Sequence, residues 1–502
     1  MTGGVELRQS EPQSPDTRAF LAREQQLLIG GDWLAASGGS FETRDPATQH
    51  VLSHIPRATL RDADDAIASA KQSFDRATWR GLPAAHRAQV LWQVATLIDQ
   101  HADTLAELET LNQGKTWATS RFAEVPAAAE QFRYFAGFAT KVHGQTITPS
   151  ITYQPEGKTV KAQTYREPVG VVAAITPWNS PLLMACMKLA PALAAGCSVV
   201  LKPAEATSLT ALYLGKLLQQ AGIPPGVVNI ITGYGHEVGA HLASHADVNK
   251  ISFTGSTSTG RALIQASSGN MKRLTLELGG KSPVVILPDA DLDAAAAGIM
   301  RGSYANGGQV CVSGSRIYVA RPAYEHLSEI LLARLRSVRL GHGLDREVDM
   351  GALVSPEHAA KVSGYVFGDH GGEVLTGGQA AGPHASFVVP SLIAAPNAQS
   401  ALMRDEVFGP VAAIIPFDEL DEAIDWANDT SYGLAASVWT AGLSQAHRVA
   451  DAIKAGTVWV NGHSYFSPEL PKGGWGQSGW GVENNAEGLE NYLQTKTVCM
   501  II

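Results

Sequence analysis

The sequence predicts an α/β protein with two doubly wound parallel-sheet domains and a β arm for oligomerisation. Two series of alternating strand-like and helix-like segments predict the domains, one at about 169–253 and the other at about 284–460. A β-rich hairpin pattern at 151–166 predicts the arm, because an exposed strand edge needs a partner. A length of 502 residues agrees with several domains rather than one.

The composition excludes several classes of protein. A net charge of -9 argues against nucleic acid or a membrane surface as a partner. The most apolar stretch, 169–201, is interrupted by prolines, an asparagine and a lysine, so it is not a membrane span. Four cysteines without a Cys-x-x-Cys pair predict neither a disulfide framework nor a metal site. Because residues 1–23 contain no apolar signal segment, we expect a cytoplasmic protein.

The chain before the hairpin divides into three parts. Residues 1–25 are polar and are expected to form a loose leader. The segment 27–33, LLIGGDW, is typical of a short strand with a Gly-Gly turn. From 61 to 140, apolar residues recur at three- and four-residue spacing, which predicts helices.

The first alternating series predicts a parallel sheet with helices on both faces. Strands are expected at 169–175, 198–201, 227–231 and 250–253, and helices at 181–195, 206–221 and 237–244. Asn179 or Ser180 is expected to cap the helix that begins at Pro181. Sheets of this kind bind ligands at the carboxyl ends of their strands.

The second series and the C-terminal region complete the expected fold. Strands are expected at 284–287, 412–416 and 458–460, and helices at 324–338 and 420–428. Residues 467–483 are dense in glycine and tryptophan and predict a structured loop. The apolar end, 497–502, predicts a strand that pairs with the hairpin.

Two residues stand out as candidates for chemistry. Cys311 follows Gly307 and Gly308, and small residues there would let a substrate approach the thiol. A buried packing cysteine is the alternative, and the local sequence favours it. Glu277 lies between leucines, so desolvation would raise its pKa toward the range of a general base. Equally, Glu277 could be an outward-facing polar residue on a strand with alternating polar and apolar side chains.

Three further motifs follow predicted strands. The turn at 253–260, FTGSTSTG, opens a helix whose free N–H groups would attract a phosphate. Lys202 and Glu205 could hold a nucleotide ribose, although a surface ion pair is an alternative. Asn179 could donate to an oxyanion or could cap a helix, but it could serve only one of these roles well.

Taken together and in order, these motifs resemble those of the aldehyde dehydrogenase superfamily. The resemblance covers about 27–498. It rests on PWNSP (177–181), KPAE (202–205), FTGSTSTG (253–260), LELGGKSP (276–283), GGQVCVSGSR (307–316), DEVFGPV (405–411) and the PxGG…SGxG loop (471–481).

The resemblance implies a mechanism. Cys311 would attack the aldehyde to form a thiohemiacetal, with Asn179 and the Cys311 backbone N–H holding the oxyanion. Hydride loss to nicotinamide would leave a thioester, and Glu277 would activate the water that hydrolyses it. A carboxylate at position 277 favours hydrolysis over acyl transfer to coenzyme A.

The resemblance also implies NAD as cofactor. Glu205 would repel a 2′-phosphate, which favours NAD over NADP. The implied cofactor residues are Ile175, Pro177, Trp178, Lys202, Glu205, Gly235, Ser256, Gly279, Glu406 and Phe408. The same resemblance implies a Rossmann-like NAD-binding domain at 26–148 and 169–280 and a catalytic domain at 281–470. Segments 149–168 and 478–502 would form the arm of a homodimer or homotetramer.

The implied substrate pocket is mostly apolar. It comprises Ser180, Leu183, Met184, Met187, Val310, Val312, Tyr465 and Phe466, with Lys472 near the mouth of the tunnel. Segments 20–33 and 456–471 resemble the phenylacetaldehyde dehydrogenase branch of the family. The expected substrate is therefore a hydrophobic or aromatic aldehyde.

Three positions depart from the usual family pattern and leave alternatives open. Lys472 replaces Phe, Gly476 replaces Lys and Val482 replaces Arg. Lys472 could pair with a substrate carboxylate, which would make the protein an ω-semialdehyde dehydrogenase. A non-catalytic NAD-binding or structural protein on the same scaffold is another alternative, but the presence of both Cys311 and Glu277 argues against it.

Overall fold

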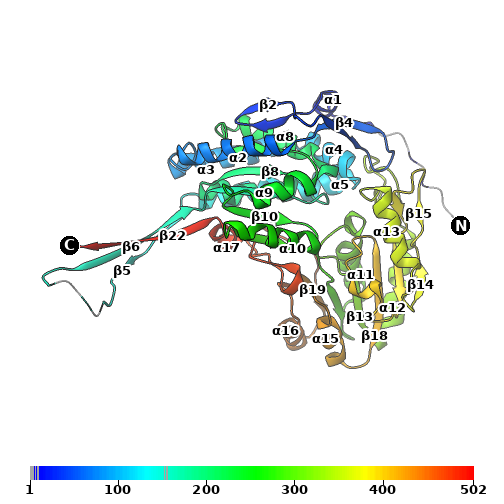
Figure 1. The fold of residues 1–502 in the computed structure, drawn as a ribbon. Helices are drawn as coiled ribbons and strands as arrows, with labels where there is room; N and C mark the ends of the chain where they lie inside the picture. The colour runs from blue at the N-terminus through cyan, green and yellow to red at the C-terminus, as the bar shows by residue number, and fades with distance from the viewer. Residues whose placement is uncertain (1–4, 6, 8–10, 152, 154–155) are drawn as a thin grey trace.

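The computed structural model describes residues 5, 7, 11–151, 153 and 156–502. Two large sheets organise the chain (Figure 1). The eight-stranded sheet has the order β2-β1-β9-β8-β7-β10-β11-β21, and the seven-stranded sheet has the order β14-β17-β18-β13-β12-β19-β20. The central strands of both sheets are parallel, and helices cover both faces, which confirms the predicted α/β class.

Parallel strands form the centre of the eight-stranded sheet. They are β7 (Val171–Ile175), β8 (Ser198–Lys202), β9 (Val228–Ile230), β10 (Lys250–Thr254) and β11 (Arg273–Glu277). Antiparallel strands β1 (Leu27–Ile29), β2 (Asp32–Leu34) and β21 (Gly479–Trp480) flank them. Because β7, β8 and β10 are parallel neighbours, their carboxyl ends lie at one edge of the sheet.

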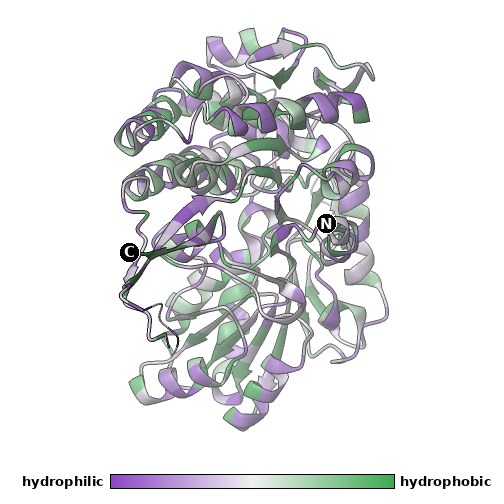
Figure 2. Cartoon of the chain, turned by 60° about the vertical axis from the view of Figure 1, so that its left-hand side comes forward, coloured by the Kyte–Doolittle hydropathy of each residue, from purple (hydrophilic) through white to green (hydrophobic). Residues whose placement is uncertain are grey.

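Successive side chains of β7 point to opposite faces of the sheet and therefore belong to two different hydrophobic cores. Val172 and Ala174 pack with one group of helices, whereas Val171 and Ala173 pack with another. The first group is α3 (Ala84–Gln100), α4 (Ala102–Gln113), α6 (Val125–Phe138), α7 (Pro181–Ala195) and α8 (Leu209–Gln220). The second is α2 (Leu60–Asp75), α9 (Ala240–Ser244) and α10 (Thr257–Ala266). Figure 2 shows apolar residues concentrated on the strands, with polar residues on the outer faces of the helices.

The seven-stranded sheet carries the second set of helices. Its strands are β12 (Pro283–Ile286), β13 (Arg316–Ala320), β14 (Glu373–Thr376), β17 (Ser391–Ala394), β18 (Val411–Phe417), β19 (Ala435–Trp439) and β20 (Thr457–Val460). Helices α11 (Leu292–Ile299) and α12 (Arg321–Arg336) pack on one core, and α15 (Leu420–Asn428) and α16 (Leu443–Ala452) pack on the other. Helix α13 (Pro356–Phe367) belongs to a smaller cluster.

Short elements connect these layers. They are β3 (Ser40–Arg44), β4 (Val51–Pro56), α5 (Trp117–Thr119), η1 (Ser120–Glu124), η2 (Glu205–Thr207), η3 (Gly235–Gly239), η4 (Ser267–Gly269), η5 (Met300–Tyr304), η6 (Ala305–Gly308), β15 (Ala380–Ala381), β16 (Phe387–Val388), α14 (Ala401–Arg404) and η7 (Gly476–Ser478). Among the described residues, no helix is both long and apolar enough to cross a membrane.

The arm projects from the body as a three-stranded sheet (Figure 1). Strand β6 (Val160–Pro168) pairs antiparallel with β22 (Leu493–Ile501), which confirms the predicted pairing of the C-terminal strand. The first of the two strands predicted for the hairpin was wrong at the residues that the structure describes. Ile151 and Tyr153 lie outside any strand, residues 152, 154 and 155 lie outside the described residues, and β5 (Thr146–Ile147) pairs with β6 instead.

Two other expectations need correction. The leader is not loose throughout, because residues Pro15–Leu21 form helix α1, which is capped by Ser14. Phe20 of this helix packs edge-on against Tyr213, with 5.2 Å between the ring centroids. The predicted arm segment 478–502 is only partly arm. Strand β21 joins the eight-stranded sheet, and Leu489 of α17 (Asn485–Glu490) packs into the core beneath it.

Candidate active site

Cys311 lies in the loop between η6 and β13, and tight backbone turns form this loop. Gly308 has φ +70°, and a Cβ there would lie 2.0 Å from the carbonyl oxygen of Gly409, so only glycine fits. Cys311 is half-buried and contacts a cluster of Val312, Leu434 and Ala435. Burial raises the pKa of the thiol, whereas the nearby charge of Lys472 lowers it.

Asn179 is fixed against the same loop. Its Nδ2 donates to the Gln309 carbonyl oxygen at 2.9 Å, two residues before the cysteine. Its own carbonyl oxygen accepts from Lys115 Nζ at 2.7 Å. The cap position of α7 belongs to Ser180, which makes no capping bond with its side chain, so Asn179 is not a helix cap. The amide of Asn179 therefore faces the cysteine loop.

Glu277 ends β11 and is buried, with 1% of its surface exposed. Its Oε2 accepts from Lys472 Nζ at 2.9 Å, and its Oε1 has no hydrogen-bond partner in the described part of the chain. Burial raises the pKa of Glu277 to about 7, although the charge of Lys472 opposes the shift. Glu277 also raises the pKa of Cys311, so the two groups lie within electrostatic reach of each other.

Lys472 lies deeper than expected. Only 7% of its surface is exposed, and it contacts Glu277 rather than lining an open tunnel mouth. Burial by itself lowers the pKa of Lys472, but Glu277, Cys311 and Glu483 outweigh burial and raise it. Lys472 therefore favours its charged form, in contact with the Glu277 carboxylate and within electrostatic reach of the Cys311 thiol.

A second buried ion pair, which was not predicted from the sequence, lies beside the first. Lys188 Nζ contacts Glu483 Oε1 at 2.6 Å, and both side chains are buried. The backbones of Lys472 and Glu483 bond to each other in both directions, at 2.9 and 2.7 Å. Four charges thus lie in one buried chain, in the order Lys188, Glu483, Lys472 and Glu277. Their signs alternate, which offsets the cost of burying them.

Another buried cluster supports Asn179 and was also missed. Lys115 Nζ contacts Glu124 at 2.6 Å and Glu109 at 3.5 Å, and Ser180 Oγ donates to Glu124 at 3.0 Å. Burial raises the pKa of Glu109 to about 8. The sequence around these residues shows only helical periodicity, which carries no signal of a buried charge cluster.

The expected cofactor residues lie at two places. Lys202 ends β8 and contacts Glu205 at 3.3 Å, and Gly239 of the turn that begins at Gly235 lies beside the Lys202 stem. Ile175 ends the neighbouring strand, and Ser256 caps α10 by accepting from the Thr259 N–H at 3.2 Å. Pro177 follows Ile175 in the chain.

The second place lies beside the cysteine loop. Glu406 Oε1 accepts from the Gly280 N–H at 3.1 Å, and a Cβ on Gly279 would meet Glu406 Oε2 at 2.3 Å. Burial raises the pKa of Glu406 to about 7. The rings of Trp178 and Phe408 lie edge to face at 5.2 Å. A small cavity of about 10 Å³ is lined by Glu406, Phe408 and Val310, among others, so these residues adjoin the cysteine loop.

The expected substrate residues differ in exposure. Met187 and Val312 are buried, and Ser180, Leu183, Met184 and Val310 are half-buried. Tyr465 and Phe466 are exposed. Two partners of this exposed pair were missed. Arg301 lies over the Tyr465 ring at 5.0 Å, and Trp459 lies edge-on to Phe466 at 5.4 Å.

Comparisons with known proteins agree with this geometry. Residues 33–498 match the aldehyde dehydrogenase family. Phenylacetaldehyde dehydrogenase of Pseudomonas fluorescens is 43% identical over 94% of this chain and 95% of that protein. Mitochondrial benzaldehyde dehydrogenase of Antirrhinum majus is 40% identical over 94% of this chain and 88% of that protein. The NAD+ complex of an aldehyde dehydrogenase from Bacillus cereus superimposes with a TM-score of 0.94 at 41% identity, covering 99% of this chain and 100% of that one.

Proposed function

Because the chain belongs to the aldehyde dehydrogenase family, we propose that it oxidises a hydrophobic aldehyde to the acid with NAD and water, through Cys311. One observation supports this proposal most strongly: three reactive groups converge on one loop, the loop that contains Cys311. They are the half-buried Cys311 thiol, the Asn179 amide and the buried Glu277 carboxyl.

The described residues fit NAD as the cofactor. Thr176 Oγ1 and Thr254 Oγ1 are buried without a hydrogen-bond partner in the described chain, next to the ends of β7 and β10, where a bound ligand would lie. The half-exposed Glu205 can accept from ribose hydroxyls, and its charge disfavours a 2′-phosphate. Ser256 at the start of α10 suits the diphosphate. The bound nicotinamide supplies a hydride acceptor.

The protein side chains then act in two stages. Cys311 Sγ adds to the carbonyl carbon, and the Asn179 amide and the Cys311 N–H stabilise the oxygen that becomes negative. After oxidation the acyl group is held as a thioester on Cys311. Glu277 Oε1, which has no partner within the described chain, takes a proton from water as the water attacks the thioester carbon. The Cys311 thiolate leaves, and the carboxylic acid is released.

Lys472 is proposed as a positioning residue for Glu277. Its ammonium holds one carboxylate oxygen at 2.9 Å, while the other oxygen has no hydrogen-bond partner in the described chain. The same charge lowers the pKa of both Glu277 and Cys311, which favours their reactive, ionised forms. Because Lys472 already has a carboxylate partner, the structure gives no support to pairing with a substrate carboxylate.

Lys472→Met is expected to shift the pH dependence of kcat upward, because Glu277 acts in the hydrolysis step that follows oxidation. Losing the cation raises the pKa of Glu277 above about 7, so a higher pH is needed to ionise the base. An opposite charge at this distance changes a carboxyl pKa by about 1–3 pH units, and the ascending limb should move by a similar amount. The measurement is kcat for one saturating aldehyde across pH in the parent and the variant.

Lys472→Arg is the matched control, because it keeps the charge and should restore most of the parent profile. An ascending limb at the same pH in Lys472→Met would remove the positioning role. A loss of activity confined to acidic semialdehydes would instead favour the ω-semialdehyde alternative.

A substrate panel tests the proposed class. The pocket residues are mostly apolar, and the relatives named above include dehydrogenases of aromatic aldehydes. We expect kcat/KM for phenylacetaldehyde and benzaldehyde to exceed that for short polar aldehydes and for semialdehydes by about tenfold or more, as removal of apolar contact costs roughly this much. NADH formation should exceed NADPH formation. Highest activity with short polar aldehydes would contradict the proposal.

The arm and the cysteines support proposals about the oligomeric state and the cellular location of the protein. The exposed strands β5 and β22 at the two edges of the arm sheet suit pairing between copies of the chain, so we propose a homodimer or homotetramer, to be checked by light scattering. All four cysteines are free, and a catalytic thiol needs reducing conditions, which supports a cytoplasmic location.

A further inference from the structure

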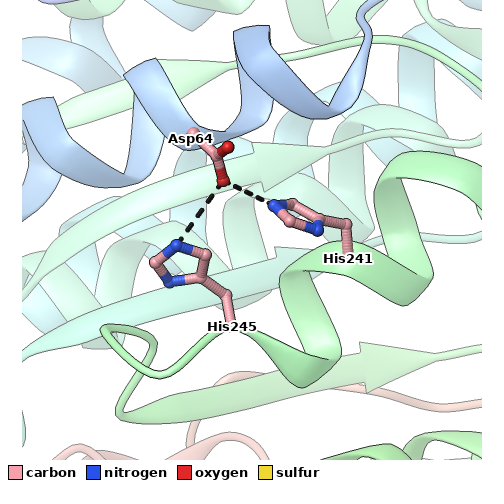
Figure 3. A group of neighbouring side chains, drawn as sticks. All are labelled: Asp64, His241 and His245. Carbon is pink, nitrogen blue, oxygen red and sulfur yellow. Dashed lines mark hydrogen bonds and ion pairs between the residues drawn. The ribbon is translucent and has the colours of Figure 1, made fainter.

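A group of metal-binding side chains lies between α2 and α9, outside the site described above. Figure 3 shows Asp64 reaching from α2 toward His241 on α9 and His245 at the end of that helix. Asp64 Oδ1 lies 2.5 Å from His241 Nε2 and 3.5 Å from His245 Nε2. One donor atom from each residue lies within 4.8 Å of the other two. No metal site was expected from the sequence, because the cysteines form no Cys-x-x-Cys pair.

The spacing of the two histidines explains why they converge. Residues four apart in a helix lie on the same face, one turn apart, so both imidazoles point toward α2. Asp64 supplies a carboxylate from the facing helix. Two imidazoles and one carboxylate are a typical donor set for Zn²⁺, Ni²⁺ or Co²⁺, whereas Mg²⁺ and Ca²⁺ prefer oxygen donors alone.

The present contacts allow an ion to enter with small movements. Two donors, each about 2.1 Å from one ion, lie at most about 4.2 Å apart. The contacts to Asp64 already fall within that limit, and modest rotation of the side chains would bring the imidazoles into range. His245 Nδ1 accepts from the exposed Asp247 N–H at 3.1 Å. Metal binding through Nε2 would transfer the ring proton to Nδ1, and water would replace this exposed bond.

The site is accessible from a neighbouring pocket. His241 lines a pocket of about 660 Å³ together with Arg57, Thr59 and Glu237, among others. Arg57 and Glu237 pair at 2.6 Å, so their charges largely cancel there. Asp64 therefore provides the net negative charge of the group, and positions not filled by protein would hold water.

We propose that Asp64, His241 and His245 form a binding site for one divalent transition-metal ion of the Zn²⁺, Ni²⁺ or Co²⁺ class. The ion would join α2 to α9, two helices that pack on the same face of the eight-stranded sheet. Its role would be structural, because these residues belong to the outer layer of helices, whereas Cys311 lies in the loop before β13. The proposal does not depend on the dehydrogenase activity.

Titration calorimetry with Ni²⁺ and Zn²⁺ tests the site, using full-length protein without an affinity tag. All variants carry Cys311→Ser, so that the reactive thiol cannot bind the metal. His241→Ala and Asp64→Asn remove one donor each. His236→Ala is the matched control, because His236 lies on the preceding turn, is exposed and belongs outside the three-residue group.

We expect one ion per chain in the parent and in His236→Ala. Affinity should fall by about tenfold or more in His241→Ala and Asp64→Asn, since each variant loses a direct ligand. As a second readout, Ni²⁺ should raise the thermal midpoint of the parent and of His236→Ala but not of His241→Ala. Equal affinity in all four proteins, or no stoichiometric binding to a folded parent, would overturn the proposal.

Discussion

Cys311→Ala is expected to abolish aldehyde-dependent NADH formation, by about 10⁴-fold or more. Without the thiol no covalent adduct can form, and Asn179 and Glu277 have no intermediate to stabilise or hydrolyse. The substitution removes one atom from a half-buried side chain, so the fold and NAD binding should remain. NADH absorbance with phenylacetaldehyde measures the loss, and fluorescence titration measures NAD binding.

Cys499→Ala is the control for this substitution. Cys499 is exposed and lies on β22 of the arm, so its removal should leave the rate unchanged. If Cys311→Ala retained a substantial fraction of the activity while Cys499→Ala lost it, the catalytic thiol would be assigned wrongly.

Glu277→Gln is expected to separate oxidation from hydrolysis. Glutamine keeps the shape and can still accept from Lys472, but it cannot take a proton from water. Steady-state turnover should fall by about 10²–10⁴-fold, whereas a burst of one NADH per active site should remain. Stopped-flow absorbance distinguishes the burst from the steady state.

The pH dependence gives a second test of Glu277. Burial raises the pKa of its carboxyl to about 7, so hydrolysis in the parent should accelerate as the pH rises through that value and the carboxylate forms. Glu277→Gln should lose this ascending limb, because glutamine does not titrate. An unchanged steady-state rate and pH profile in Glu277→Gln would assign the general base to another group.

Short runs of apolar residues in the sequence predicted the central strands and indicated which polar residues lie at or near their ends. Strands such as β7, β8 and β10 are short runs of apolar residues, and they lie where the sequence places them. Lys202, expected directly after a strand, is the last residue of β8, and Glu277, expected within a strand, is the last residue of β11. The strands β13 and β19 were missed, although both are fully buried in the second sheet.

The buried charges could not be predicted from local pattern. Lys188 and Glu483 come from segments far apart in the chain, and only the folded structure brings these two charges together. Lys472 was noticed only as a departure from the family pattern. Its contact with Glu277 depends on the loop at 471–483 folding back onto the end of β11, which no local signal encodes.

Mass spectrometry of Glu277→Gln after mixing with NAD and phenylacetaldehyde can detect the covalent intermediate on Cys311 itself. We expect a phenylacetyl thioester to accumulate on the peptide that contains Cys311, because hydrolysis is blocked after oxidation. The adduct should require both NAD and the aldehyde, and it should disappear in Glu277→Gln combined with Cys311→Ala. A full burst of NADH without an acylated Cys311 peptide, or an acyl group on another residue, would exclude Cys311 as the nucleophile.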